Sequence, residues 1–81
     1  MSGPEIPERV RGVLSTVFDV PAHTIDDDAS MDTVAGWDSL QQLTVVLAIE
    51  EEFGIALTDD EVTTMVTFPL IVAVVSDHLA A

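Results

Sequence analysis

The chain has 81 residues, 48% of them hydrophobic, and it contains no cysteine. This length gives room for one small domain with a thin core, and the missing cysteines exclude disulfides, thiolate metal sites and a cysteine nucleophile. Fifteen acidic residues oppose Arg9 and Arg11, so the formal net charge is −13. Such a charge argues against binding to nucleic acid or to an anionic membrane, and it favours brief encounters with basic partner proteins.

No stretch reaches the roughly 18 apolar residues of a membrane span, and the N-terminus lacks a basic segment followed by an apolar run. We therefore expect a soluble, cytoplasmic monomer in which residues 1–81 form a single domain. Residues 1–4 offer no apolar anchor and should be loosely held.

A first amphipathic helix is expected from about Pro7 to Val20, where apolar residues recur at spacings of three and four. Pro7 suits a first helical turn, and Pro21 disfavours helical geometry at the residue before it. From Pro21 to Asp38 the residues are mostly polar, small or acidic. This segment predicts a long loop, and long loops in small domains are usually functional or disordered.

The acids of this loop do not form a complete calcium motif. Alternate residues resemble the start of an EF-hand, but Met31 replaces its turn glycine and Trp37 its bidentate glutamate. We expect loose divalent affinity and no specific metal site. His23 and His78 have no evident third ligand and are expected at the surface.

A second helix is expected from Ser39 to Phe53, with Gly54 as its C-terminal stop. At about 100° per residue it has two apolar stripes on nearly opposite faces. The first stripe consists of Leu40, Leu43 and Leu47, and the second of Val45, Val46, Ile49 and Phe53. A small core needs only one of these stripes, so the other requires a partner.

Thr58 can cap a short third helix over about Asp59 to Met65, and Thr67 can cap a fourth helix that has Pro69 in its first turn. The fold is therefore expected to be all-α: a small four-helix bundle with three longer helices, a short third helix and a long loop between the first two. The expected core comprises Val13, Val17, Ile49, Phe53, Leu57, Val62, Met65, Val66, Phe68, Ile71 and Val75.

Ser39 stands where the long loop becomes the second helix. A serine at such a position is usually only a cap, but Asp38 is itself a strong cap and makes Ser39 unnecessary for that purpose. A phosphodiester on the Ser39 oxygen would lie at the positive end of the helix dipole, where an anion is stabilised. The position therefore suits a phosphorylated or phosphopantetheinylated serine.

Three segments together resemble an acyl carrier protein. Asp38-Ser39-Leu40 matches the attachment motif of that family, residues 50–55 resemble the acidic end of its second helix, and residues 59–61 fit the start of its third. The resemblance implies that a phosphopantetheinyl transferase moves 4′-phosphopantetheine from coenzyme A to Ser39, between Asp38 and Leu40. It also implies a carrier of acyl thioesters that is not an enzyme, served by acyl-loading, condensing and tailoring enzymes.

The second helix is the partner-recognition element of this family. We expect the partners to have basic or apolar docking sites. The residues of this chain expected to contact them are Leu40, Gln41, Leu43, Thr44, Leu47, Glu50 and Glu51. Gln41 and Thr44 stand where family members often carry acids, and Trp37 departs from the commonest pattern. These departures favour polyketide or related specialised synthesis over bulk fatty-acid synthesis.

Several alternatives stay open at this point. The chain is alternatively a carrier of aminoacyl or peptidyl groups, although the Gly-Gly-x-Ser pattern usual for those is absent. From a different class, it is alternatively an unmodified acidic adaptor that docks through its leucines. Trp37 either packs over the loop, which we favour, or touches the arm. The core either opens to shelter an acyl chain or is simply filled.

Overall fold

The structure, a computed structural model, describes residues 5–80. It contains α1 (Glu5–Phe18), a short 3-10 helix η1 (Ala22–Thr24), α2 (Ser39–Phe53), α3 (Asp59–Thr64) and α4 (Phe68–Ala80). Residues 5–80 form no strand beyond one isolated bridge between Ser30 and Thr67. The expected all-α bundle with a short third helix is confirmed. The expectation for residues 1–4 lies outside the described residues.

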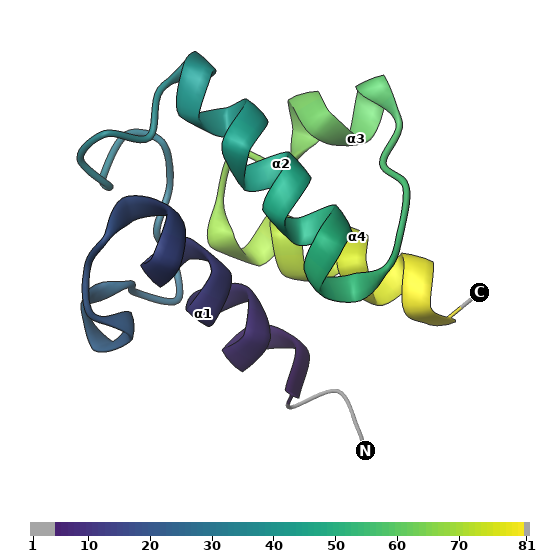
Figure 1. Cartoon of the computed structure of the whole chain (residues 1–81), viewed down its shortest axis with the longest axis horizontal. Helices are drawn as coiled ribbons and strands as arrows, with labels where there is room; N and C mark the ends of the chain where they lie inside the picture. The colour runs from purple at the N-terminus through teal and green to yellow at the C-terminus, as the bar shows by residue number, and fades with distance from the viewer. Residues whose placement is uncertain (1–4, 81) are drawn as a thin grey trace.

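The helices enclose a core between α1, α2 and α4, and the short α3 lies above α4 in the view of Figure 1. The long loop lies at one end of the bundle, and the connection from α2 to α3 lies at the other (Figure 1). The C-terminal end of α3 returns toward the start of α2, where Gln42 contacts Val62 and Met65. No helix of residues 5–80 has the length and apolar character needed to cross a membrane.

Helix α1 is displaced toward the N-terminus relative to the sequence-based boundaries. It begins at Glu5, so Pro7 lies within its first turn, and it ends at Phe18, two residues before Val20. Asp19 adopts a left-handed conformation with φ 56°, and the N–H of Val20 donates to the carbonyl of Ser15 at 3.1 Å. This left-handed C-terminal turn stops the helix before Pro21 can.

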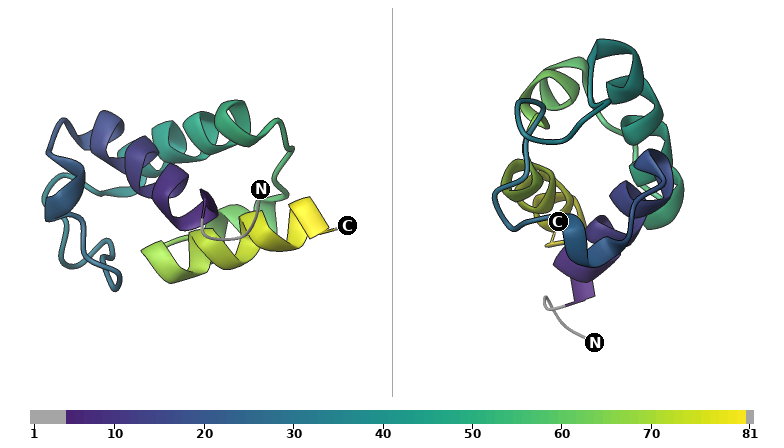
Figure 2. Two further views of the ribbon diagram at one scale, coloured as in Figure 1. Left: turned by 90° about the horizontal axis from the view of Figure 1, so that it is seen from below. Right: turned by 90° about the vertical axis from the view of Figure 1, so that its left-hand side faces the viewer.

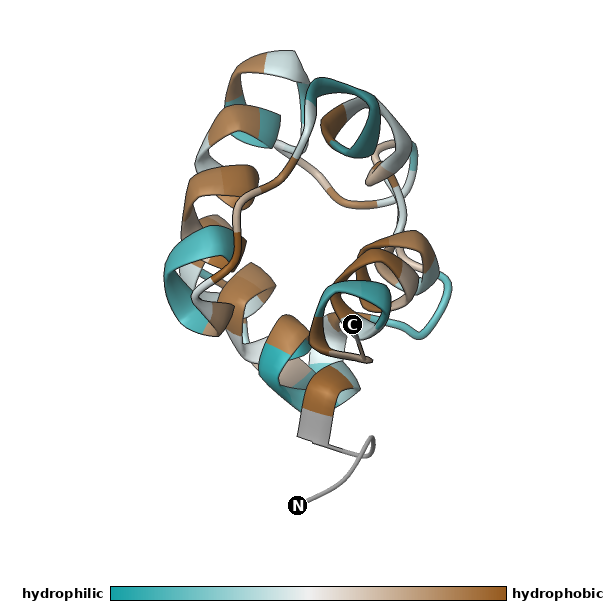
Figure 3. Ribbon diagram, turned by 90° about the vertical axis from the view of Figure 1, so that its right-hand side faces the viewer, coloured by the Kyte–Doolittle hydropathy of each residue, from teal (hydrophilic) through white to brown (hydrophobic). Residues whose placement is uncertain are grey.

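The core is lined by the apolar faces of α1, α2 and α4, and hydrophobic residues predominate along α4 (Figure 3). Of the expected core residues, Ile49, Met65, Phe68, Ile71 and Val75 are buried, whereas Phe53, Leu57, Val62 and Val66 are only half-buried. The expected contribution of α1 was wrong. Its fully buried residues are Val10 and Leu14, whereas Val13 and Val17 are half-buried at the edge of the core because the helix is turned by about one residue, or roughly 100°.

The long loop is held to the bundle and crosses from the end of α1 to the start of α2 (Figure 2). Ile25, Ala29 and Trp37 are buried in the core, so the loop brings its own apolar anchors. The N–H of Phe68 donates to the carbonyl of Ala29 at 2.7 Å, which joins the loop to the start of α4. An ordered loop of this kind gives Ser39 a defined position.

Candidate functional site

A tight turn positions the start of α2. Gly36 has φ 88°, a conformation that strains any other residue, and its carbonyl accepts a hydrogen bond from the N–H of Asp38 at 3.1 Å. Asp38 then adopts an extended conformation, and its carboxylate accepts from the N–H of Gln41 at 2.9 Å. The expectation that Asp38 caps this helix is confirmed.

Ser39 is the first residue of α2 and is exposed to solvent. Asp38 provides the cap, so the Ser39 hydroxyl is not needed to close the helix. The first backbone N–H groups of a helix have no partner within it, and together with the helix dipole they favour an anion. An ester of phosphate on the Ser39 oxygen therefore fits this end of α2 both sterically and electrostatically.

The three leucines of α2 form an exposed strip beside Ser39, which we call the leucine stripe. Leu40, Leu43 and Leu47 are 77%, 57% and 66% exposed. On the opposite stripe Val45, Val46 and Ile49 are buried, and Phe53 is half-buried against the core. The expected division of α2 into a core face and a free apolar face is confirmed, and a free apolar face of this kind is typical of a binding surface.

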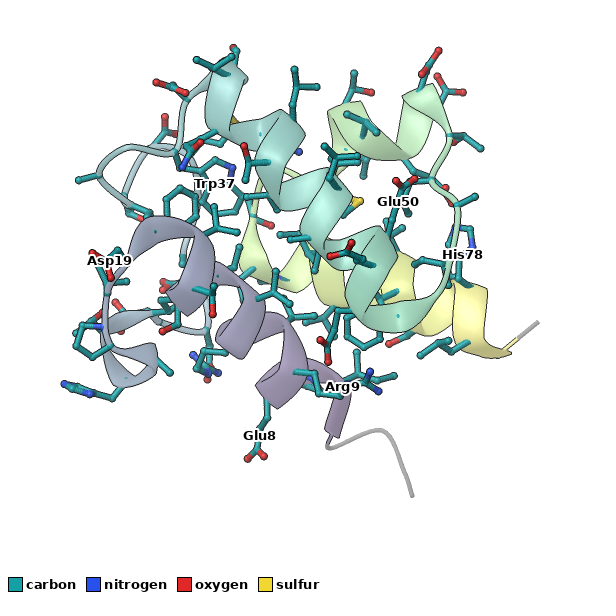
Figure 4. The ribbon with its side chains drawn as sticks, in the orientation of Figure 1. Glu8, Arg9, Asp19, Trp37, Glu50 and His78 are labelled. Carbon is teal, nitrogen blue, oxygen red and sulfur yellow. The ribbon has the colours of Figure 1, made fainter. Side chains whose placement is uncertain are left out.

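The polar residues near the leucine stripe differ in their exposure and in their hydrogen bonds. Thr44 and Glu51 are exposed. Gln41 is half-buried, and its side-chain amide donates to the carbonyl of Val17 at 3.4 Å. Glu50 is also half-buried and turns toward the loop before α3, where its carboxylate accepts from the N–H of Leu57 at 2.8 Å (Figure 4). Gln41 and Glu50 thus lie at the edges of this surface and have contacts of their own.

Two shallow hollows flank the exposed side of α2. One of about 590 Å³ is lined by Thr44, Leu47, Ala48, Glu50 and Glu51. The other, of about 400 Å³, lies between α1 and α2 and is lined by Arg9, Gly12, Val13, Thr16, Ala48, Glu51 and Glu52. The first hollow combines Leu47 and Ala48 with Glu50 and Glu51, which suits long side chains that end in a positive charge, whereas the second already contains Arg9, paired with Glu52.

Trp37 lies inside the bundle (Figure 4) and is only 3% exposed. Its ring packs against Phe18 with a centroid distance of 5.6 Å, and its indole N–H donates to Oε1 of Gln42 at 2.7 Å. Of the two roles considered for Trp37, the structure shows the structural one. Its position beside Asp38 ties the turn before Ser39 to the core.

Gln42 is a site residue that the sequence reasoning missed. It is 7% exposed, and its side-chain amide donates to the carbonyls of Val62 at 3.0 Å and Met65 at 2.9 Å. The available signal was its spacing, since residues 42, 45, 46 and 49 share one face of the helix. A polar residue within a buried stripe needs hydrogen-bond partners, and here they come from α3 and Trp37.

Both arginines of the chain are engaged by neighbouring side chains. Arg9 forms an ion pair with Glu52 at 2.8 Å and lies 4.5 Å above the ring of Phe53. Arg11 pairs with Asp27 at 2.6 Å and donates to the carbonyl of Ile25. The positive charges are therefore already compensated, and the remaining acids leave a strongly negative surface.

His78 is not the free surface residue that was expected. Its Nε2 lies 2.9 Å from both carboxylate oxygens of Glu61, so it joins α4 to α3, whereas His23 is exposed. The backbone N–H of Thr58 lowers the pKa of Glu61 most, and His78 lowers it further. The described residues contain no group of three or more His, Asp or Glu side chains arranged to hold a metal ion.

Comparison with known proteins agrees with this geometry. Residues 8–75 match the family model described as a phosphopantetheine attachment site. The chain is 28% identical over its full length to acyl carrier protein 3 of Ralstonia nicotianae, of which the match covers 93%. It is 38% identical over 63 residues to an acyl carrier protein of a Bradyrhizobium species and 35% identical over 63 residues to one of Sinorhizobium fredii. Each of these matches covers 78% of the chain, and they cover 80% and 81% of the two relatives.

These matches define a phosphopantetheine-bearing domain, as the exposed serine at a helix start suggests. The chain belongs to the acyl carrier protein family. Domains of this family bear a 4′-phosphopantetheine group, are carriers and not catalysts, and interact with phosphopantetheinyl transferases and acyl-handling enzymes. The resemblance inferred from Asp38-Ser39-Leu40 and the downstream acids is confirmed at the level of the family.

Proposed function

We propose that Ser39 is the attachment residue and that the protein carries acyl groups on an arm joined to its hydroxyl. The observation that carries this proposal is that the cap of α2 and its exposed serine are two different residues. Asp38 caps the helix and Ser39 remains exposed within the Asp38-Ser39-Leu40 motif. When bound, the phosphopantetheine group supplies a terminal thiol that holds acyl groups as thioesters.

The residues around Ser39 hold the attachment point and perform no chemistry. Asp38 fixes the first turn of α2 through the N–H of Gln41, and Trp37 fixes the preceding turn through Gln42. The positive end of α2 stabilises the negative charge of the phosphodiester once it is formed. A flexible arm on a firmly held serine lets one acyl group reach several enzymes at high effective concentration.

We further propose that partner enzymes dock on the exposed side of α2, from Leu40 to Glu51. The leucine stripe supplies the apolar centre, Thr44 and Glu51 are the free polar residues beside it, and Gln41 and Glu50 lie at its edges. The surplus negative charge favours enzymes whose docking sites are basic at the rim. The apolar area beside the arm favours sites with an apolar centre.

Gln41 and Thr44 leave α2 without a charged residue before Glu50, which supports a role in polyketide or related specialised synthesis over bulk fatty-acid synthesis. A condensing enzyme of either pathway can be offered the acyl-loaded protein. We expect acyl transfer to the condensing enzyme of specialised synthesis to be faster than transfer to the condensing enzyme of fatty-acid synthesis. Monomeric state and cytoplasmic location remain predictions from the sequence.

The attachment proposal is tested with coenzyme A and a phosphopantetheinyl transferase of broad specificity. Intact mass spectra should show one added phosphopantetheinyl group on the wild type and none on Ser39→Ala. Ser76→Ala, which removes a serine hydroxyl on α4, is the matched control and should be modified like the wild type. Equal modification of Ser39→Ala would overturn the proposal.

A further inference from the structure

The short helix α3 is held to the bundle mainly by polar side chains from its neighbours. None of its own residues is buried. At one end, Glu50 of α2 accepts from the N–H of Leu57, just before α3 begins. At the other end, Gln42 of α2 donates to the carbonyls of Val62 and Met65, and from the opposite side His78 of α4 contacts Glu61.

Gln42 is the most protected of these contacts. Its amide nitrogen donates one hydrogen to Val62 of α3 and the other to Met65, which follows α3, and its oxygen accepts from Trp37. Among the described residues, no buried side-chain nitrogen or oxygen lacks a hydrogen-bond partner. Moving α3 away from α2 would break both Gln42 bonds and leave polar groups unpaired in an apolar setting, which is strongly unfavourable.

These hydrogen bonds cross the boundary between α2 and α3 next to the attachment point. Gln42 follows Ser39 by three residues, about one helical turn. Met65, whose carbonyl Gln42 binds, is fully buried and packs in the same core as Val45 and Ile49. An acyl chain that entered the core between α2 and α3 would have to separate these groups.

We propose that the hydrogen-bonded chain from Trp37 through Gln42 to Val62 and Met65 closes this boundary, so that an acyl chain on the arm stays outside the core. The inference rests on the proposed attachment at Ser39. Gln42 acts as a positioning residue, since it holds α3 in place and does not bind the acyl group. The acyl chain is then presented in solution to the partner, and the partner enzyme must select its length.

The test uses wild-type protein loaded by the transferase from acetyl-, butyryl- and octanoyl-coenzyme A, with the loading of each sample verified by its intact mass. The melting temperature and the emission maximum of Trp37, the only tryptophan, are then measured. Both should be the same for all three acyl groups. A melting temperature that rises with chain length overturns the proposal, whereas a failure to load contradicts the attachment proposal instead.

Variants of Gln42 test whether this residue keeps the boundary between α2 and α3 closed. In Gln42→Ala the octanoyl form should melt at a higher temperature than the acetyl form, because the opened boundary admits the chain. Gln42→Met, which keeps the length of the side chain but none of its hydrogen bonds, should do the same and serves if the alanine variant does not fold. Thr63→Ala removes a hydrogen bond internal to α3, to Asp60, and should behave as wild type. Flat melting temperatures in both Gln42 variants would overturn the assignment.

Discussion

The carboxylate of Asp38 accepts a hydrogen bond from the backbone N–H of Gln41 at 2.9 Å, so the cap of α2 belongs to the residue before Ser39. Capping and the proposed attachment are thereby assigned to two neighbouring residues. A modified serine that also served as the cap would lose one function on gaining the other. With Asp38 as cap, Ser39 can bear a bulky group while the helix start stays closed.

This division predicts different effects of two adjacent alanine substitutions on stability. Asp38→Ala should lower the free energy of unfolding by about 1 kcal/mol, the usual cost of losing a cap. Ser39→Ala should change it by less than about 0.5 kcal/mol, because the side chain is exposed. Urea denaturation followed by circular dichroism measures both. A loss at Ser39 as large as that at Asp38 would show that Ser39 shares the capping.

Trp37→Phe should weaken the fold even though a phenyl ring fills much of the same space. The substitution removes the indole N–H and leaves Oε1 of the buried Gln42 without its donor. An unpaired buried acceptor costs about 1–3 kcal/mol of unfolding free energy. Because the variant lacks tryptophan, circular dichroism at increasing urea is the suitable measurement. A loss well below 1 kcal/mol would mean that packing against Phe18 is the whole contribution of Trp37.

Leu43→Asp should weaken the binding of partner enzymes and leave the stability of the fold nearly unchanged. Leu43 is 57% exposed at the centre of the leucine stripe, so the melting temperature should stay close to that of the wild type. Binding to a partner enzyme should weaken at least about tenfold, or about 1.4 kcal/mol, as for a central apolar contact. Thr63→Asp adds the same charge at an exposed position on α3 and should bind normally. Equal weakening in both variants would point to charge alone.

The contact of Glu61 with Thr58 and His78 predicts a pH-dependent contribution to stability. The pKa of Glu61 lies below its ordinary value of 4.5, chiefly because the backbone N–H of Thr58 donates to the carboxylate and secondarily because of His78. A carboxylate with a lowered pKa in the folded state contributes stability that is complete above its ordinary pKa. That contribution is lost as the pH falls through the lowered value.

Glu61→Gln keeps the reciprocal cap with Thr58 and removes the charge. The wild type should therefore melt above the variant at about pH 7, and the difference should shrink as the pH falls below the ordinary pKa of 4.5 and through the lowered pKa of Glu61. Thermal unfolding of both proteins across this range provides the comparison. A difference that stays constant with pH would show that the charge of Glu61 contributes nothing to the fold.

The residues that act locally could be predicted from the sequence. Asp38, Gly54 and Thr58 cap or stop their helices as expected, because capping depends on a few neighbouring backbone groups. The two faces of α2 also followed from the spacing of its apolar residues. The sequence alone therefore indicated which side of α2 carries the leucine stripe beside Ser39.

The contacts of Gln42, Glu50 and His78 could not be predicted in the same way. Each joins residues that are distant along the chain, and hydrogen-bond partners across helices are fixed only when the helices pack. Glu50 is the clearest example of a contact that the sequence does not predict. Its position in an acidic run predicted a free surface charge, but the return of the chain toward α3 brings the N–H of Leu57 within its reach.

Fragmentation of the intact modified protein shows at the level of the residue whether Ser39 bears the proposed arm. After reaction with coenzyme A and the transferase, fragments that end before Ser39 should have unmodified masses. Fragments that include Ser39 should all carry one phosphopantetheinyl group. An added group that maps to any other residue, or a protein that gains none, would contradict attachment at Ser39.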